Sequence, residues 1–462
     1  MSTTEMRPAV PVRPVRGGRW IDHWEPEDPG FWEKTGRRVA NRNLWFSIFA
    51  EHIGFSMWTV WSVLVLFMGP AYGVDPAGKF FLVAIPALIG ALIRLPYTMA
   101  PARFGGRNWT IVSALLLLIP TFLAIIVMEP GTSYTTLMVV AALGGLGGGN
   151  FASSMVNINT FFPEGRKGWA LGLNAGGGNI GVPAVQLLGL LVIATAGTAY
   201  PRLVLAVYIP LIVIAALCAA VFMDNISSVR HDSGALREAV RDSQTWVMSF
   251  LYIGTFGSFI GYSFAFGLVL QTQFGRTPLQ AASVAFIGPL IGSLIRPVGG
   301  WMADRFGGAK VSLWNFIGMA LATGLVIMAS ELKSLPLFVA GFIGLFVLSG
   351  IGNGSTYKMI PSIFAGKAKV AIETGEPAQP ALMRARRLSG AVIGIAGSIG
   401  AMGGLLINLA FRQSFLTAQS GIPAFWAFMA FYGACVVVTY VVYLRRAPAT
   451  APEHPRLAYA GV

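Results

Sequence analysis

The sequence is poor in charged residues, and this shortage excludes a fold that is surrounded by water. Only 11% of the 462 residues are Asp, Glu, Lys or Arg, whereas 55% are hydrophobic. Soluble globular domains carry about 25% charged residues, so this chain does not have enough polar side chains to cover a compact fold in water. We therefore expect a membrane protein.

Cysteine, histidine and the motifs of common enzymes are also scarce. The two cysteines, Cys218 and Cys435, lie in apolar runs, which argues against a disulfide framework or a thiolate metal site. The sequence contains no HExxH zinc motif, no P-loop and no dinucleotide-binding glycine motif. We therefore expect no enzyme activity, no metal and no cofactor.

Apolar runs recur along the whole chain and predict transmembrane helices. A chain crosses hydrocarbon only as helices or as a closed barrel, and the period-2 alternation of barrel strands is not seen. At about 20 residues per crossing, the expected fold is an all-α membrane protein with twelve transmembrane helices. The predicted spans are 44–68, 79–102, 109–128, 135–162, 168–195, 201–223, 244–272, 278–303, 311–330, 335–364, 388–411 and 422–444.

The basic residues are distributed unevenly between the loops. When alternate loops are assigned to opposite sides, one side collects 25 basic residues and the other side five. Basic loops remain in the cytoplasm, so both chain ends are expected to be cytoplasmic. The net charge of +14 then reflects membrane topology rather than nucleic-acid binding.

The chain ends are polar. Residues 1–43 are rich in Pro and Arg and contain no uninterrupted apolar run, so they do not resemble a cleaved signal peptide. We expect a disordered tail followed by a short element at the cytoplasmic surface. The expected organisation is a cytoplasmic tail (1–43), a six-helix half (44–223), a cytoplasmic linker (224–243), a second six-helix half (244–446) and a cytoplasmic tail (447–462).

The sequence contains an internal repeat. Arg94 is followed nine residues later by a second Arg and then by Phe-Gly-Gly, and Arg296 begins the same pattern 202 positions further on. Glycine-rich segments around Asn150 and Asn353 match at nearly the same offset. Two homologous halves that both start on the cytoplasmic side form a parallel repeat, which is typical of transporters.

Two sets of motifs resemble a known family. GWMADRFGGAK at 300–310 is similar to the loop motif of the major facilitator superfamily, although the first copy has Ala102 in place of the acid. The segments 144–181 and 350–404, rich in Gly and Asn, resemble the paired nitrate-signature motifs of the nitrate/nitrite porter family within that superfamily. The resemblance covers nearly the whole chain. It implies the major facilitator fold and transport of nitrate and nitrite by alternating access between the two halves.

Two arginines lie deep within predicted spans. Arg94 and Arg296 are each nine residues from an Arg at the cytoplasmic end, which places them about 13 Å inside a hydrocarbon core about 30 Å thick. An Arg at this depth costs about 2.5–3.5 kcal/mol on insertion scales. The alternative is a buried ion pair, but only Glu51 of the 19 acids lies deep in a span. The protein itself therefore does not supply enough negative charge to neutralise both arginines, and we expect a bound anion to do so. The planar set of N–H donors on an Arg side chain suits a small planar oxyanion.

The family resemblance adds further residues to this site. It implies that Arg94 and Arg296 clamp nitrate or nitrite, joined by Asn174 in the fifth span and by Tyr252 in the seventh span, with Phe256 one turn further on. Counted from the cytoplasmic ends of their spans, Asn174 and Tyr252 reach a similar depth to the arginines. The alternative for Tyr252 and Phe256 is that they are packing aromatics.

Glu51 and His52 in the first span are possible proton-coupling residues. Exchange of nitrate for nitrite needs no protonatable group, whereas anion uptake against an inside-negative potential costs about 2.3 kcal/mol per charge per 100 mV and needs co-moving cations. A membrane-embedded Glu beside a His is a candidate proton carrier. The alternative is that Glu51 pairs permanently with one arginine. Nitrate/nitrite antiport and proton-coupled nitrate uptake therefore both remain open.

Other functions are compatible with parts of this pattern. The chain could carry another small anion or an organic anion, or it could be a membrane sensor that binds nitrate without moving it. The predicted loops 224–243 and 365–387 are short for a signalling domain. The expected partners are nitrate and nitrite, protons in the coupled mode, and the lipid bilayer, with the chain acting as a monomer.

Overall fold

The computed structural model describes residues 19–228 and 233–445, so the expected C-terminal tail lies outside the described residues. Within these ranges, twelve helical spans are long and apolar enough to cross a membrane, which confirms the predicted number. The elements are β1 (Trp20–Ile21), α1 (Pro29–Phe31), η1 (Trp32–Gly36), α2 (Arg37–Phe67), η2 (Pro70–Tyr72), α3 (Pro76–Phe104), α4 (Gly106–Leu116), α5 (Leu118–Val127), α6 (Tyr134–Gly144), α7 (Leu146–Phe161), α8 (Glu164–Asn179), α9 (Gly181–Ala196), α10 (Arg202–Phe222), β2 (Asn225–Ile226), α11 (Ser233–Arg241), α12 (Ser243–Tyr252), η3 (Ile253–Gly257), α13 (Ser258–Phe274), α14 (Pro278–Ala285), α15 (Ile287–Phe306), α16 (Gly308–Glu331), α17 (Leu335–Glu373), α18 (Ala378–Ala418), α19 (Ile422–Thr439) and η4 (Tyr440–Leu444).

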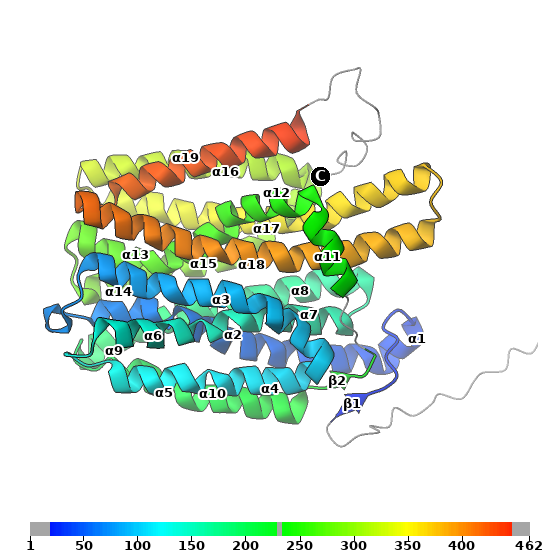
Figure 1. Ribbon diagram of the computed structural model, residues 1–462, viewed down its shortest axis with the longest axis horizontal. Helices are drawn as coiled ribbons and strands as arrows, with labels where there is room; N and C mark the ends of the chain where they lie inside the picture. Colours follow the sequence, from blue (N-terminus) through cyan, green and yellow to red (C-terminus); the bar gives the residue numbers. More distant parts are fainter. Residues whose placement is uncertain (1–18, 229–232, 446–462) are drawn as a thin grey trace, which may run out of the picture.

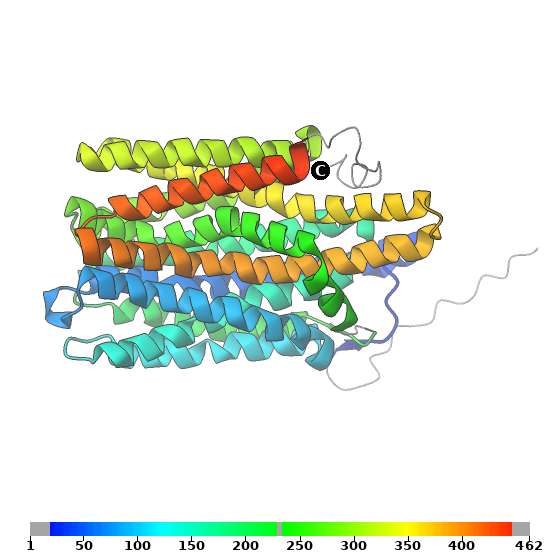
Figure 2. The ribbon, with the colours of Figure 1, turned by 45° about the horizontal axis from the view of Figure 1, so that its top comes forward.

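The spans lie alongside one another in two bundles. In Figure 1 the first six spans, coloured blue to green, occupy the lower part of the view, and the last six, green to red, occupy the upper part. The small elements β1, β2 and α11 lie together at one end of the bundle, and the view in Figure 2 agrees. We call this the α11 end. The turn between α17 and α18 also projects from it.

Contacts between the two bundles follow the internal repeat. Helix α3, the second span, packs against α18, the eleventh span. The fifth span, α8 and α9, packs in the same way against the eighth span, α14 and α15. Because the second and eighth spans are equivalent in the repeat, as are the fifth and eleventh, the two interfaces are related by a pseudo-two-fold axis.

Glycines allow each of the two helices that carry an arginine to pack closely against a neighbouring span. A Cβ atom on Gly148 of α7 would lie 2.8 Å from the Cα atom of Gly90 on α3. A Cβ atom on Gly350 of α17 would lie 2.3 Å from the carbonyl oxygen of Gly292 on α15. Each pair is separated from the other by 202 positions, and Gly90 and Gly292 each lie one helical turn before the arginine of their helix. Small residues therefore fix both arginine helices in equivalent positions.

The first span begins earlier than its hydrophobicity predicts. Its helix starts at Pro29 rather than near residue 44, because the side chain of Asp28 caps it by accepting the Gly30 N–H at 2.8 Å. Trp32 and Ile21 pack into a cluster with Phe161 and Ile226 at the α11 end. The short surface element expected after the tail is therefore an extension of the first span.

A short sheet joins this N-terminal segment to the end of the sixth span. β1 pairs in parallel with β2, with Trp20 opposite Asn225. The buried carboxylate of Asp224 accepts hydrogen bonds from Arg42 at 2.5 Å and from the Asn43 amide at 2.8 Å. The Arg19 guanidinium lies 3.6 Å from the same carboxylate. This strap holds the first and sixth spans together at the α11 end.

The prediction of a loop at 365–387 was wrong. Helix α17 continues to Glu373 and α18 already begins at Ala378, so both helices extend beyond the apolar runs that defined the spans. Ionic contacts to the region of α11 stabilise these extensions, since Lys367 pairs with Asp242 at 2.6 Å and Arg387 with Glu238 at 2.6 Å. Hydrophobicity detects where a helix leaves the lipid, not where it ends.

Candidate functional site

Arg94 lies at the centre of the bundle with part of its guanidinium unpaired. The residue is 1% exposed. Its Nη1 donates to the Gly397 carbonyl at 2.8 Å, and its Nε donates to the Gly148 carbonyl at 3.2 Å. Its Nη2 is buried and has no hydrogen-bond partner among the described residues. Two neutral carbonyls position the charge without neutralising it.

Aromatic rings enclose the same guanidinium. The Cζ atom lies 4.9 Å from the centroid of Phe151 and 5.2 Å from the centroids of both Trp58 and Phe256. The faces of aromatic rings attract cations and exclude water. Arg94 is therefore held as a cation in a site with little water to screen it.

Arg296 in the second half has a similar unpaired donor. The residue is 8% exposed, and its Nη1 is buried without a hydrogen-bond partner in the described ranges. The Cζ atom lies 5.6 Å from the centroid of Tyr357. Arg94 and Arg296 are close enough to repel one another electrostatically. The structure thus brings together the two arginines that the repeat predicted.

Tyr252 and Phe256 lie beside the arginines: the Phe256 ring contacts Arg94, and Tyr252 is near both guanidinium groups. The Tyr252 hydroxyl interacts electrostatically with both arginines, but it meets no partner in good hydrogen-bond geometry within the described residues. The two rings are stacked with centroids 5.3 Å apart. Tyr252 directly precedes the π-helical turn η3 and Phe256 lies within it, and this turn packs closely against α18 because Gly257 faces Gly403 there. Such turns interrupt helices frequently at functional sites.

Glu51 does not form an ion pair with either arginine. Its Oε2 accepts hydrogen bonds from the Ser154 hydroxyl and from the Asn174 amide, each at 2.6 Å. The ion pairs found in residues 19–228 and 233–445 involve other acids. Glu51 still interacts electrostatically with both Arg94 and Arg296. The structure therefore does not support the alternative that Glu51 forms a permanent ion pair with one of the arginines.

Asn174 and His52 contact other groups of the protein, unlike the unpaired donors of the two arginines. The Asn174 Nδ2 also donates to the Ser154 hydroxyl at 2.6 Å. The His52 ring Nδ1 lies 3.4 Å from the Gly177 carbonyl oxygen on α8. Asn174 thus contacts Glu51 in this conformation, while His52 faces the backbone of the fifth span.

A cavity of about 300 Å³ leads from Arg94 to the α11 end. Phe151, Tyr357 and Gly397 line its inner part beside the arginine. Its outer part includes Asn159 and Arg387, both exposed. A small anion can therefore reach the arginine site from the α11 end.

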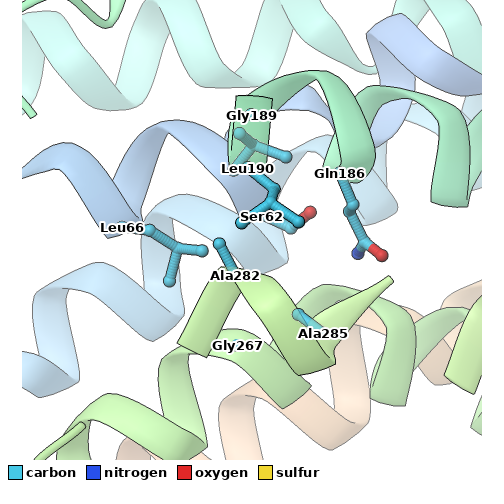
Figure 3. A pocket seen from close by; sticks show the side chains of 9 residues that line it. Ser62, Leu66, Gln186, Gly189, Leu190, Gly267, Ala282 and Ala285 are labelled. Atoms are coloured by element: carbon cyan, nitrogen blue, oxygen red, sulfur yellow. The ribbon is translucent and has the colours of Figure 1, made fainter. Parts of the chain in front are cut away.

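The opposite end of the bundle is closed. Figure 3 shows the pocket there, where Gly189 and the small residues Gly267, Ala282 and Ala285 let the two halves approach closely. Its volume is about 10 Å³, room for no more than about one water molecule. The Gln186 amide also donates to the Ser263 carbonyl at 2.8 Å across the halves. The two halves are thus in close contact at this end, where α9 packs against α14 and α2 against α13.

Sequence reasoning missed three aromatic residues of the site. Trp58 lies seven residues after Glu51, so two helical turns place both on one face of the first span. Phe151 directly follows the glycine-rich segment at Asn150, and Tyr357 lies four residues after Asn353. These positions relative to the motifs were the available signal. Because 12% of the residues are aromatic, composition alone could not single out these three.

Comparison with known proteins shows the family of this chain. The family model described as Major Facilitator Superfamily matches residues 44–407. The nitrate/nitrite transporter NarU of Salmonella typhimurium is 38% identical, with 93% of this chain and 97% of NarU covered. The NarU of Escherichia coli is also 38% identical, with 92% and 96% covered. The probable nitrate/nitrite antiporter NarK2 of Thermus thermophilus is 34% identical, with 93% and 97% covered.

Proposed function

Because the chain belongs to the nitrate/nitrite porter family of the major facilitator superfamily, we propose that it transports nitrate and nitrite across a bacterial inner membrane by alternating access. The expectations of a major facilitator fold and of membership in this family are confirmed. The transported ions are proposed from the names of the relatives and from the chemistry of the central site.

The observation that carries this proposal is a set of buried donors without acceptors. Arg94 Nη2, Arg296 Nη1 and the Tyr252 hydroxyl all lack partners within the described residues. Unsatisfied buried donors are costly, and charged ones more so. A planar anion with two or three oxygens would accept from all three and would relieve the repulsion between the arginines. Phe256 would then form an apolar wall beside it.

Asn174 is a conditional ligand in this proposal. Its amide nitrogen lies 2.6 Å from both Glu51 Oε2 and the Ser154 hydroxyl, so it would release these partners to reach the anion. The donors of the two arginines and Tyr252 would make the first contacts.

The proposed transport cycle moves the halves 44–223 and 244–446 as units about this site. The cavity at the α11 end and the closed pocket at the other end are supporting observations. If the basic loops face the cytoplasm, this conformation is open inward and both termini are cytoplasmic. Because all three donors come from one chain, a monomer would be sufficient.

Counterflow in proteoliposomes tests this function. Vesicles loaded with unlabelled nitrate or nitrite should accumulate labelled nitrate, and sulfate or a small carboxylate inside should not support accumulation. Arg94→Lys and Arg296→Lys should abolish it, because Lys keeps the charge but loses the planar fork. Arg202→Lys is the control, since Arg202 pairs with Glu129 in an exposed position. Accumulation driven by an organic anion but not by nitrite would favour another cargo, and nitrate binding without flux would favour a sensor.

A further inference from the structure

Glu51 is a buried acid that the anion site does not use. It is 1% exposed, and only its Oε2 is hydrogen-bonded, to Ser154 and Asn174. Its Oε1 is buried with no partner among the described residues. The oxygen lies against the helix of the fifth span, where a Cβ on Gly178 would be 2.3 Å away. A carboxyl with one satisfied and one bare oxygen is suited to accept and release a proton.

The ionisable groups that face Glu51 come from three helices. Arg94 on α3 and Arg296 on α15 attract its charge, and Tyr357 on α17 also interacts with it. The neighbouring helices α7 and α9 contain no ionisable side chain, and the ionisable residues of α8 are confined to its first turn at the α11 end. The ring of His52, its neighbour in sequence, lies against the Gly177 carbonyl of α8. Glu51 is therefore attracted by both arginines, of which Arg94 lines the cavity.

We propose that Glu51 is the site of a proton that is transported together with the anion, an inference that rests on the proposed function. An anion and a proton entering together convert the carboxylate to a carboxylic acid and place one negative charge between the arginines. With two arginines, the empty site with an ionised Glu51 carries a net charge of +1. The loaded site with a neutral Glu51 and one nitrate carries the same charge. One proton for each nitrate therefore leaves the charge of the moving site unchanged.

Asn174 links the proton to the anion. Its amide is held by the Glu51 carboxyl and by Ser154. A neutral carboxyl is a weaker acceptor than a carboxylate. Protonation of Glu51 thus loosens the Asn174 amide, which becomes available to the anion. The Asn174 amide would thus bind Glu51 in the present conformation and bind the anion after protonation, which is the role that the family resemblance implies.

The proton has a short path to the cavity. Asn174 Nδ2 lies 3.6 Å from the sulfur of Met155, and Met155 lines the cavity that leads to the α11 end. One side chain therefore separates the Glu51 cluster from the cavity. A rotamer change of an unbranched Met side chain would admit water to it.

Proteoliposomes with an imposed pH gradient test the inference. The wild type is expected to accumulate nitrate when the outside is acidic, with no dependence on a potential set by valinomycin and potassium, and a trapped dye should report about one proton per nitrate. In Glu51→Gln, the nitrate accumulation driven by the pH gradient should fall by at least about tenfold, whereas nitrate counterflow should remain. His52→Gln is the matched control and should keep both. Wild-type counterflow, together with net nitrate accumulation that neither follows the imposed pH gradient nor carries protons, would overturn the inference but not the proposed function. Absent counterflow would overturn the function itself.

A second variant covers the case in which Glu51→Gln does not fold. Glu51→Asp retains a carboxyl on a shorter stem, away from Ser154 and Asn174, and should shift the pH profile of nitrate accumulation by about half a unit or more. A purely structural role would leave that profile unchanged. Accumulation by Glu51→Gln at the wild-type level, or an unshifted profile for Glu51→Asp, would contradict Glu51 as the proton site.

Discussion

The Arg94 guanidinium donates to the carbonyl oxygen of Gly397 at 2.8 Å, and this bond joins the second span to the eleventh span at the inner end of the cavity. The bond connects the two halves beside the site where we place the anion. When the halves rock apart at this point, Arg94 loses a neutral acceptor that an anion can replace. Substrate binding and the contact between the halves are therefore coupled through one side chain.

The carbonyls of Gly148 and Gly397 both accept from Arg94, but only Gly148 is packed too tightly to carry a side chain. We expect Gly148→Ala to reduce counterflow by at least about tenfold, because its Cβ would lie 2.8 Å from Gly90 Cα and overpacking costs about 1–3 kcal/mol. Gly397→Ala should stay within about twofold of wild type, since its Cβ would lie 3.9 Å from Arg94. Equal losses in both variants would contradict this explanation.

Phe256 contributes to anion affinity through Arg94. Phe256→Leu keeps apolar volume but removes a cation–π contact, which is worth about 0.5–2 kcal/mol. The KM for nitrate is expected to rise by about 2-fold to 30-fold. Phe250→Leu is the control, because the Phe250 ring packs against Phe431 and not against Arg94. A KM for Phe256→Leu equal to that of the control would show that the ring only packs.

Asp224 stabilises the α11 end of the first half. Asp224→Ala leaves the partly exposed Arg42 and the buried Asn43 without their acceptor and should lower stability by about 1–3 kcal/mol. The measurement is thermal unfolding in detergent, with Glu129→Gln, which removes only an exposed ion pair, as the control. The surviving protein should show an unchanged KM for nitrate. A change in unfolding temperature no larger than that of the control would contradict the role of this strap.

Access to the site can be mapped with introduced cysteines. In a background with Cys218→Ser and Cys435→Ala, Gly390→Cys in the cavity should react with a membrane-impermeant thiol reagent applied from the cytoplasmic side. Ala282→Cys at the closed pocket should react slowly from either side. Faster labelling of Ala282→Cys, or labelling of Gly390→Cys from the outside, would contradict the proposed orientation.

The spans and the arginine pair were predictable from the sequence for physical reasons. Hydrocarbon tolerates only apolar helices, so twelve runs gave twelve spans. Arg94 and Arg296 stood out because charges are rare at that depth and because the repeat placed them in equivalent positions. Both signals come from strong energetic constraints that act on a single residue or a single run.

Features that depend on contacts between distant segments were not predictable. The continuation of α17 and α18 beyond the lipid depends on pairs such as Lys367 with Asp242, which no local pattern reveals. The bonding of Glu51 to Ser154 could not be read from either residue, since Ser154 is one of many serines in the spans. Phe151 and Trp58 belong to the site only because glycines bring their helices close to Arg94.

Equilibrium binding of nitrate to the purified protein tests the arginine pair most directly. Nitrate should bind the wild type saturably, measured by calorimetry or by the rise in unfolding temperature, and sulfate should not. Arg94→Lys and Arg296→Lys should each lose binding while remaining folded, and Arg202→Lys should bind as the wild type does. Unchanged nitrate affinity in either central lysine variant would contradict a site formed between these two residues.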